Sequence, residues 1–214
     1  MKVYFISGLA ADSRVFKNIK LPEGFEAVYL DWIKPLKDES LESYAIRLAE
    51  KIDHHKKFIL VGLSMGGMIA SEIAKKYKPE ITILVSSAPT FRQFPKRFRV
   101  ARNLHLHKII PAGFLKSASV VMRLFTTESP EDKVVLKQVI RDSDPLFIRW
   151  AIGAILNWRN EVIPQPMWHI HGTNDKILPM RYTKPTHIIT NGGHLMIMSR
   201  ANDLNRILES IRDI

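Results

Sequence analysis

The sequence predicts an α/β fold, in which helices flank a mostly parallel sheet of six strands and a helical insertion caps it. Six short runs along the 214-residue chain are continuously apolar, as in parallel strands that are buried on both faces. Patterns of helical period separate most of these runs. The composition, with 46% hydrophobic residues, 25% charged residues and no cysteine, excludes a disulfide scaffold or a disordered tail.

The expected strands and their helices follow one another along the chain. The apolar runs lie at residues 3–6, 27–30, 58–63, 81–85, 167–170 and 187–189. After the second run, apolar residues recur at steps of three and four from Leu41 to Ile52, and Ser40 can cap the resulting helix. Similar patterns over residues 65–77 and 201–211 predict two more helices. This alternation is typical of a wound sheet.

Between residues 90 and 164 the alternation of strands and helices stops. Prolines mark the ends of this interval, at Pro89, Pro95, Pro164 and Pro166. Within it, helical patterns occur at residues 116–125, 130–141 and 145–158. We therefore expect a core formed by residues 1–89 and 165–214, and a helical cap formed by residues 90–164.

A Gly-x-Ser-x-Gly motif lies where the third strand turns into the helix that follows it. It consists of Gly62, Ser64 and Gly66. A sharp strand-to-helix turn holds its central residue in a strained backbone conformation and leaves no room for side chains two residues away on either side. The turn would lift the Ser64 hydroxyl clear of the sheet, at the positive end of a helix. Taken alone, the motif is equally typical of an ordinary tight turn.

An acid and a base follow the fifth and sixth strands. Asp175 lies just beyond the fifth apolar run, and His194 lies just beyond the sixth. A nucleophilic serine needs a general base, and that base needs a carboxylate to orient it. Because the carboxyl ends of parallel strands meet at one edge of a sheet, we expect Ser64, Asp175 and His194 to lie together.

Together these motifs resemble those of the α/β-hydrolases, over nearly the whole chain outside the insertion. The order Ser64, Asp175, His194 is the order in which that family places its triad. The resemblance implies that Ser64 is the nucleophile, that His194 acts first as a base and then as an acid, and that Asp175 orients His194.

The resemblance also implies an oxyanion hole made of backbone N–H groups. One belongs to Met65, directly after the nucleophile, and the other to Leu9 in the loop after the first strand. Ser7 departs from the family pattern, because many members have a histidine at this position before the glycine. The departure does not remove the backbone donor.

The expected function is that of a serine hydrolase that cleaves a small-molecule carboxylic ester or thioester through an acyl-enzyme. Two alternatives use the same fold: an acyltransferase or lyase that acts on an acidic substrate, and a non-catalytic ligand-binding protein. No cofactor is implied.

A metal site is not expected, because the His105-x-His107 pair has no carboxylate or cysteine cluster beside it. His169, His171 and His187 lie in apolar strands and are expected to be core or edge histidines.

Positive charge is concentrated at the start of the insertion. The net charge is +11, and residues 91–123 include no Asp or Glu. The basic residues there are Arg92, Lys96, Arg97, Arg99, Arg102, Lys108, Lys116 and Arg123. This cluster fits a solvated helix face, an anionic substrate, or peripheral contact of the cap with a membrane surface, and no motif that reads nucleic acid accompanies it. Since no run approaches the roughly 20 apolar residues that span a bilayer, we expect a cytoplasmic protein without a transmembrane segment.

Overall fold

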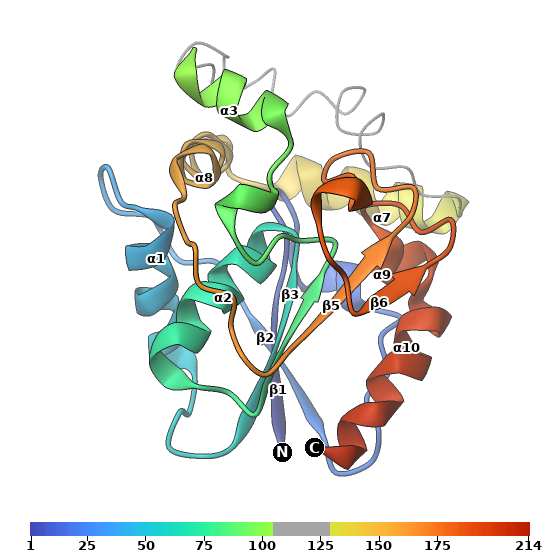
Figure 1. The fold of residues 1–214 in the computed structure, drawn as a ribbon. Coiled ribbons are helices and arrows are strands. Elements are labelled where there is room, and N and C mark those ends of the chain that lie inside the picture. The colour runs from blue at the N-terminus through green and yellow to red at the C-terminus, as the bar shows by residue number, and fades with distance from the viewer. Residues whose placement is uncertain (105–128) are drawn as a thin grey trace.

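The structure, a computed structural model, describes residues 1–104 and 129–214. The six strands of these residues form one sheet with the order β2-β1-β3-β4-β5-β6 (Figure 1). They are β1 (Lys2–Ile6), β2 (Glu26–Leu30), β3 (Phe58–Leu63), β4 (Ile81–Val85), β5 (Met167–Gly172) and β6 (His187–Ile189). Every pairing between neighbours is parallel. The predicted sheet is confirmed, and it is entirely rather than mostly parallel.

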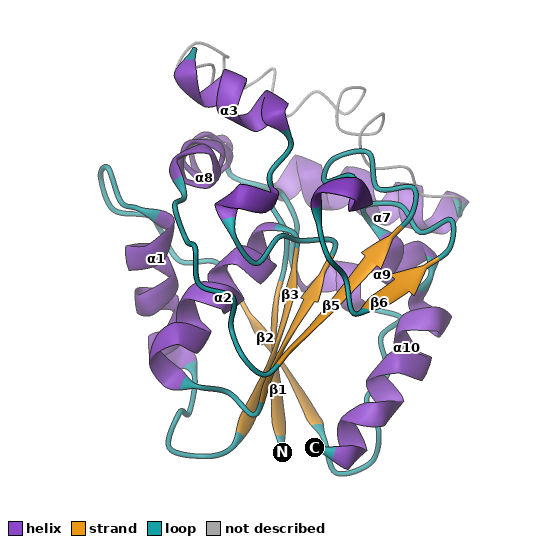
Figure 2. Cartoon of the chain, viewed as in Figure 1, coloured by secondary structure: helices purple, strands orange, loops and turns teal. Residues whose placement is uncertain are grey.

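Helices cover both faces of this sheet (Figures 1 and 2). One side carries α1 (Leu41–Leu48), α2 (Met65–Tyr77) and α8 (Pro145–Asn157). The other side carries α7 (Pro130–Asp142), α9 (Met196–Ser199) and α10 (Ala201–Glu209), and α3 (Lys96–Asn103) lies above the carboxyl ends of the strands. The short 3-10 helices are η1 (Ser13–Phe16), η2 (Ala49–Lys51), η3 (Phe91–Gln93), η4 (Met180–Tyr182) and η5 (Ser210–Asp213).

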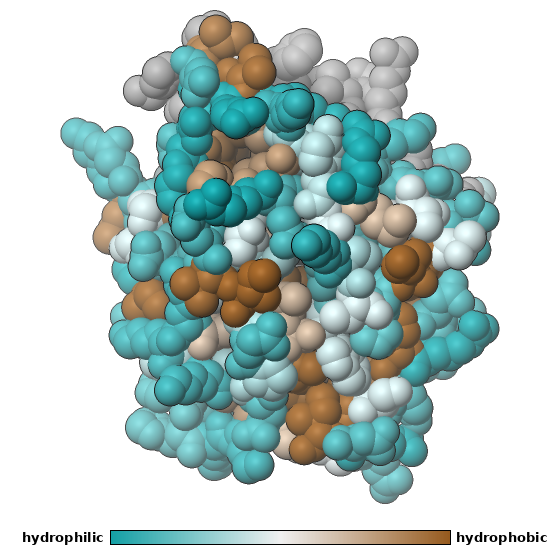
Figure 3. Space-filling model, viewed as in Figure 1, coloured by the Kyte–Doolittle hydropathy of each residue, from teal (hydrophilic) through white to brown (hydrophobic). Residues whose placement is uncertain are grey.

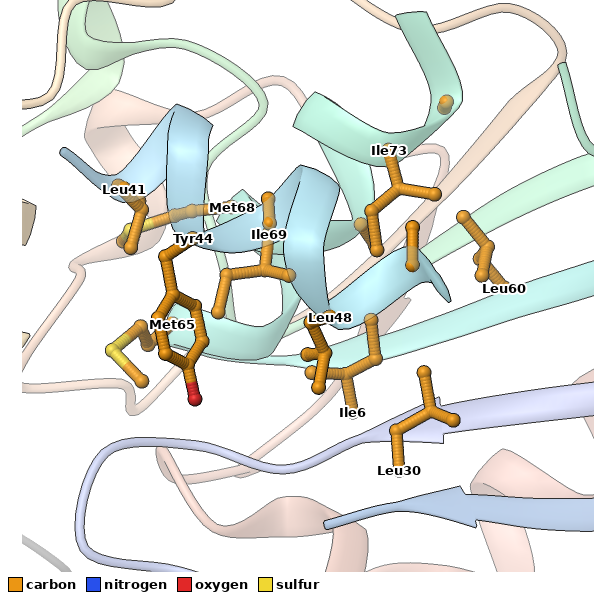
Figure 4. Close-up of a cluster of buried hydrophobic side chains, with 14 of the residues drawn as sticks. Ile6, Leu30, Leu41, Tyr44, Leu48, Leu60, Met65, Met68, Ile69 and Ile73 are labelled. Atoms are coloured by element: carbon orange, nitrogen blue, oxygen red, sulfur yellow. The ribbon is translucent and has the colours of Figure 1, made fainter. Parts of the chain in front are cut away.

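Successive side chains of the strands enter two hydrophobic clusters. Val3 and Phe5 of β1 lie in the cluster that includes α7, α9 and α10, whereas Tyr4 and Ile6 lie in the cluster that includes α1, α2 and α8. Figure 4 shows the second cluster, where the apolar faces of α1 and α2 meet over the sheet. Because both faces are buried, the continuous apolarity of the strands is explained.

Most expected helices are present, with small differences at their ends. Ser40 caps α1 by accepting a hydrogen bond of 3.1 Å from the Ser43 N–H. The helix expected over residues 41–52 ends at Leu48 and continues as η2, and the one expected over residues 201–211 continues from α10 into η5. The helix expected at 116–125 and the His105-x-His107 pair lie outside the described residues.

The insertion contributes side chains to the hydrophobic core, in addition to placing α3 above the carboxyl ends of the strands. From α7, Leu136 and Val139 enter one hydrophobic cluster, and from α8, Phe147 and Ala151 enter the other. The division into a core and a cap domain stays a prediction, and these two helices share their hydrophobic clusters with strands of the sheet. Within the described ranges, no helix combines the length and the apolarity required to cross a membrane.

Candidate active site

The turn from β3 into α2 holds Ser64 in a strained backbone conformation. Its φ and ψ angles are 53° and −117°, in a region that residues with a side chain rarely adopt. The Ser64 N–H donates to the carbonyl of Val85 at 2.9 Å, and the hydroxyl of Ser87 donates to the carbonyl of Ser64 at 2.7 Å. Hydrogen bonds on both sides of the residue therefore stabilise the turn against its strain.

The two glycines of the motif are required because backbone segments approach closely at this turn. A Cβ on Gly66 would lie 2.1 Å from the carbonyl oxygen of Ile6, and a Cβ on Gly62 would lie 2.4 Å from the carbonyl oxygen of Gly66. Neither carbonyl can move aside without disturbing β1, which holds Ile6, or α2, which holds Gly66. The motif is thus a sharp elbow between strand and helix, not an ordinary tight turn.

Three loops, which follow β3, β5 and β6, bring the three predicted side chains into one hydrogen-bonded row. The Oγ of Ser64 lies 2.9 Å from Nε2 of His194, and Nδ1 of His194 lies 2.8 Å from Oδ2 of Asp175. Since an ionised carboxylate can only accept, Nδ1 carries a proton, and Nε2 of the neutral ring accepts the hydrogen bond from the Ser64 hydroxyl. His194 and Asp175 are only 2% and 4% exposed, so bulk water does not compete for this row.

Asp175 is stabilised in its ionised form. Its Oδ1 accepts hydrogen bonds of 2.8 Å from the N–H groups of Ile177 and Leu178. Burial alone raises the pKa of Asp175, but its electrostatic attraction to the His194 imidazolium, which forms when that ring takes up a proton, and the hydrogen bonds from His171, His194 and Leu178 outweigh it and hold that pKa well below its ordinary range. The carboxylate is therefore negative at neutral pH and orients the His194 ring.

The loop after β1 lies against the nucleophile. A Cβ on Gly8 would lie 3.3 Å from the Cβ of Ser64, so the backbone that continues into Leu9 is a neighbour of Ser64. Met65 is the first residue of α2, where a backbone N–H has no acceptor within the helix. The two N–H groups predicted to form the oxyanion hole thus belong to segments that flank Ser64.

Ser7 holds this loop in place. Its Oγ donates to the carbonyl of Ala11 at 2.9 Å, and the indole N–H of Trp32 donates to the same carbonyl at 2.8 Å. The residue that departs from the family pattern therefore has a role that the sequence did not reveal: it closes the loop that carries Leu9.

A known protein family matches this chain along nearly its whole length. The model of the alpha/beta hydrolase family matches residues 3–207. The chain belongs to the alpha/beta hydrolase family. An uncharacterized protein of Mycobacterium tuberculosis is 23% identical to this hydrolase over an alignment that covers 91% of this chain and 67% of that protein.

Solved structures share the fold of this hydrolase. A thermophilic esterase from Thermogutta terrifontis, with malate bound, has a TM-score of 0.74 and 21% identity, with 100% of this chain and 88% of that chain covered. MenH from S. aureus has a TM-score of 0.78 and 18% identity, with 97% of this chain and 91% of that chain covered. At these identities the likeness concerns the fold alone.

Helix α3 of the hydrolase is hydrogen-bonded to the acid loop, which we define as residues 173–178. The guanidinium of Arg97 donates from Nη2 to the carbonyls of Lys176 and Ile177, at 2.7 and 2.5 Å. One of the basic residues of the predicted cluster therefore connects two parts of the protein.

Beneath α3 the surface is hollowed and partly apolar (Figure 3). Phe94 packs between Phe98 of α3 and Trp158 at the end of α8, with ring centroids 5.1 and 5.6 Å away. These aromatic contacts hold α3 over the carboxyl ends of the strands.

Two histidines that were expected to be core residues lie next to Asp175 in the core. His169 and His171 are fully buried, and Nε2 of His171 lies 3.4 Å from Oδ2 of Asp175. The sequence signal was the His-x-His spacing at the end of the strand that precedes Asp175, since residues two apart on a strand share a face. Composition and apolarity alone did not distinguish them from ordinary core residues.

His169 is expected to make the stability of this hydrolase depend on pH. Burial, with a smaller contribution from the neighbouring His171, lowers the pKa of His169 from 6.5 to about 4. The unfolded chain therefore takes up this proton first, so stability is complete above pH 6.5 and is lost as the pH falls toward 4. A shift of this size corresponds to about 3 kcal/mol in the free energy of unfolding.

Urea denaturation at a series of pH values measures this effect. The slope between pH 6.5 and 4 should flatten in His169→Gln, which keeps a donor but has no titrating group. The exposed His55→Gln serves as the matched control and should keep the wild-type slope. Equal slopes in wild type and His169→Gln would show that His169 does not carry the pH dependence.

Proposed function

We propose that this hydrolase is a serine hydrolase that cleaves a carboxylic ester or thioester through an acyl-enzyme intermediate. The observation that carries the proposal is the row Ser64–His194–Asp175, with contacts of 2.9 and 2.8 Å, at a strained elbow. A ligand-binding protein would have no need of a buried carboxylate, an oriented imidazole and a strained serine in this order. That alternative therefore explains less of the site.

The proposed reaction has two steps. His194 takes the proton of the Ser64 hydroxyl as Oγ attacks the carbonyl carbon, and it then gives that proton to the leaving alcohol or thiol. Asp175 stabilises the imidazolium that forms in between. In the second step His194 takes a proton from the water that attacks the acyl-enzyme and gives it to Oγ of Ser64 as the acid is released.

The negative charge that develops on the carbonyl oxygen needs preorganised donors. The backbone N–H groups of Met65 and Leu9 would supply them, because their segments flank Ser64. The amino end of α2 adds a favourable dipole at the same place. No cofactor is needed for either step.

Labelling by a fluorophosphonate tests this proposal. The reagent should phosphonylate Ser64, which mass spectrometry of a peptide digest would locate, and p-nitrophenyl esters of rising chain length should be hydrolysed. Product analysis in water labelled with heavy oxygen separates hydrolysis, which places one labelled oxygen in the released acid, from acyl transfer or lyase chemistry, which does not. A protein that binds esters but never reacts with the fluorophosphonate would support the binding alternative.

An anionic substrate is a second part of the proposal, supported by the basic residues of η3 and α3. Arg92 pairs with Glu161 at 2.7 Å and Arg97 holds the acid loop, whereas Lys96 and Arg99 are exposed. Lys108, Lys116 and Arg123 of the predicted cluster lie outside the described residues.

Reversing the exposed charges should slow the reaction of anionic esters. In the double variant Lys96→Glu/Arg99→Glu, kcat/KM for a carboxylate-bearing ester should fall roughly fivefold, and the wild-type value should fall as ionic strength rises. A neutral ester should show neither effect. Lys56→Glu/Lys57→Glu, just before β3, is the charge-matched control.

If both kinds of ester respond equally, the exposed residues form a solvated face. If the double variant instead loses binding to anionic vesicles while its ester kinetics are unchanged, the cluster contacts a membrane surface.

A further inference from the structure

A second path of polar contacts joins Asp175 to Ser64, and together with the Ser64–His194–Asp175 row it forms a closed circuit. Nε2 of His171 lies 2.7 Å from the carbonyl of Leu178 and 3.4 Å from Oδ2 of Asp175. Nδ1 of His171 lies 3.1 Å from Nε2 of His169, which in turn lies 3.0 Å from the carbonyl of Ser87. Both rings come from β5 and are 0% exposed.

The partners determine where the protons lie on these rings. Nε2 of His171 faces two oxygen acceptors, so it carries the proton, and Nδ1 of the neutral ring is then an acceptor. Nε2 of His169 must therefore donate, and it is shared between Nδ1 of His171 and the carbonyl of Ser87. Among the described residues, Nδ1 of His169 is buried without a hydrogen-bond partner. This nitrogen carries no proton, and burying an unpaired acceptor costs less free energy than burying an unpaired N–H donor.

Ser87 closes the circuit at the nucleophile. Its carbonyl accepts from His169, while its hydroxyl donates to the Ser64 carbonyl at 2.7 Å. The strained elbow follows β3 and the Asp175 carboxylate follows β5, and a fixed path of side-chain and backbone groups thus connects them.

We propose that His171, His169 and Ser87 are positioning residues, which hold Asp175 and the Ser64 elbow in register for the reaction; this rests on the proposed function. His171 acts on Asp175 in two ways. Its Nε2 faces Oδ2 at 3.4 Å, and it donates to the Leu178 carbonyl, which belongs to the same turn whose N–H groups donate to Oδ1.

A purely structural role would not need this arrangement. An apolar side chain would fill the same space without the cost of burying an imidazole. Three of the four ring nitrogens instead face polar partners: Nε2 of His171 faces the acid loop, Nε2 of His169 faces the carbonyl of Ser87, and Nδ1 of His171 joins the two rings. Since the pair is neutral, it adds donors beside Asp175 without adding a charge that would compete with His194.

Comparing His171→Leu with His171→Gln tests the proposal. His171→Leu removes the donor and should lower kcat for a p-nitrophenyl ester about 30-fold with KM nearly unchanged, because misplacing a reacting group affects the transition state more than binding. His171→Gln can place an amide N–H near the position of Nε2 and should recover most of the rate. Ser87→Ala, which removes the bond to the Ser64 carbonyl, should lower kcat in the same direction.

A proton NMR signal provides a readout that does not depend on activity. The Nδ1 proton of His194, held against a buried carboxylate, should give a low-field resonance in wild type. In His171→Leu it should broaden or move, and in His171→Gln it should return toward its wild-type position. His187→Leu, on the neighbouring strand β6, is the matched control and should leave both kcat and this resonance unchanged.

The outcomes separate the two proposals. Wild-type kcat and an unchanged resonance in a cooperatively folded His171→Leu variant would overturn the positioning role while the serine hydrolase stands. If wild type cleaves no ester, the proposed function fails, and the resonance still reports whether the circuit holds Asp175 against His194. If His171→Leu does not fold, Ser87→Ala and His171→Gln decide the question. The positioning role predicts that kcat falls in Ser87→Ala and is mostly kept in His171→Gln, so equal kcat values in these two variants would overturn it.

Discussion

Replacing Ser64 with Ala is expected to lower kcat/KM for any ester that the wild type cleaves by about 10⁴-fold or more. The Oγ of Ser64 is the nucleophile of the proposed reaction, and it is the atom to which Nε2 of His194 is hydrogen-bonded at 2.9 Å. Without it no acyl-enzyme forms, so the rate that remains comes from water attacking a bound ester. Fluorophosphonate labelling should disappear in the same variant.

A neighbouring serine supplies the matched control. Ser71 is buried in α2, where its Oγ donates to the Gly67 carbonyl at 2.9 Å, and Ser71→Ala should keep labelling and most of the activity. The double variant Ser64→Ala/His194→Ala should be no slower than Ser64→Ala, because the two residues act as one unit. Labelling that persists in Ser64→Ala would place the nucleophile elsewhere.

Replacing Gly172 with Ala is expected to separate the loops that carry the acid and the base. A Cβ on Gly172 would lie 2.1 Å from the carbonyl oxygen of Gly192, which also accepts a hydrogen bond of 2.9 Å from the N–H of Asn174. Relief requires the backbone to shift by about 1 Å, enough to lower kcat/KM about 100-fold. We also expect the free energy of unfolding to fall by about 3 kcal/mol.

Ester kinetics and urea denaturation measure the two effects. Gly24→Ala is the control, because Gly24 has φ 86° but nothing within 4 Å of an added Cβ. It should cost only the backbone strain of about 1 kcal/mol and leave kcat/KM unchanged. A Gly172→Ala variant with wild-type activity and stability would show that the β5 and β6 loops can separate without disturbing His194.

The features that the sequence predicted are those with a local cause. The strands are apolar on both faces because helices cover both faces, and that pattern is visible residue by residue. Gly62 and Gly66 must be glycines because Ser64 sits in a sharp turn, so the elbow could be found from spacing alone. Parallel strands then bring the loops after β5 and β6 to the same edge of the sheet, which is why Asp175 and His194 were predicted together.

The features that the sequence did not predict depend on which strands are neighbours and in what register. His169 pairs with Leu84 in the β4–β5 register, and this places it within reach of Ser87, 82 residues earlier in the chain. The hydrogen bonds of Arg97 to the acid loop likewise join segments about 80 residues apart.

The sequence by itself therefore determined the fold class and the identity of the three residues in the candidate catalytic row, since hydrophobic period and turn chemistry are properties of neighbouring residues. Only the tertiary structure showed which side chains contact that row from the core, namely His171, His169 and Ser87. A hydrogen bond between distant segments needs a donor and an acceptor within about 3 Å, and that distance is set by the packing of the whole sheet rather than by any local pattern.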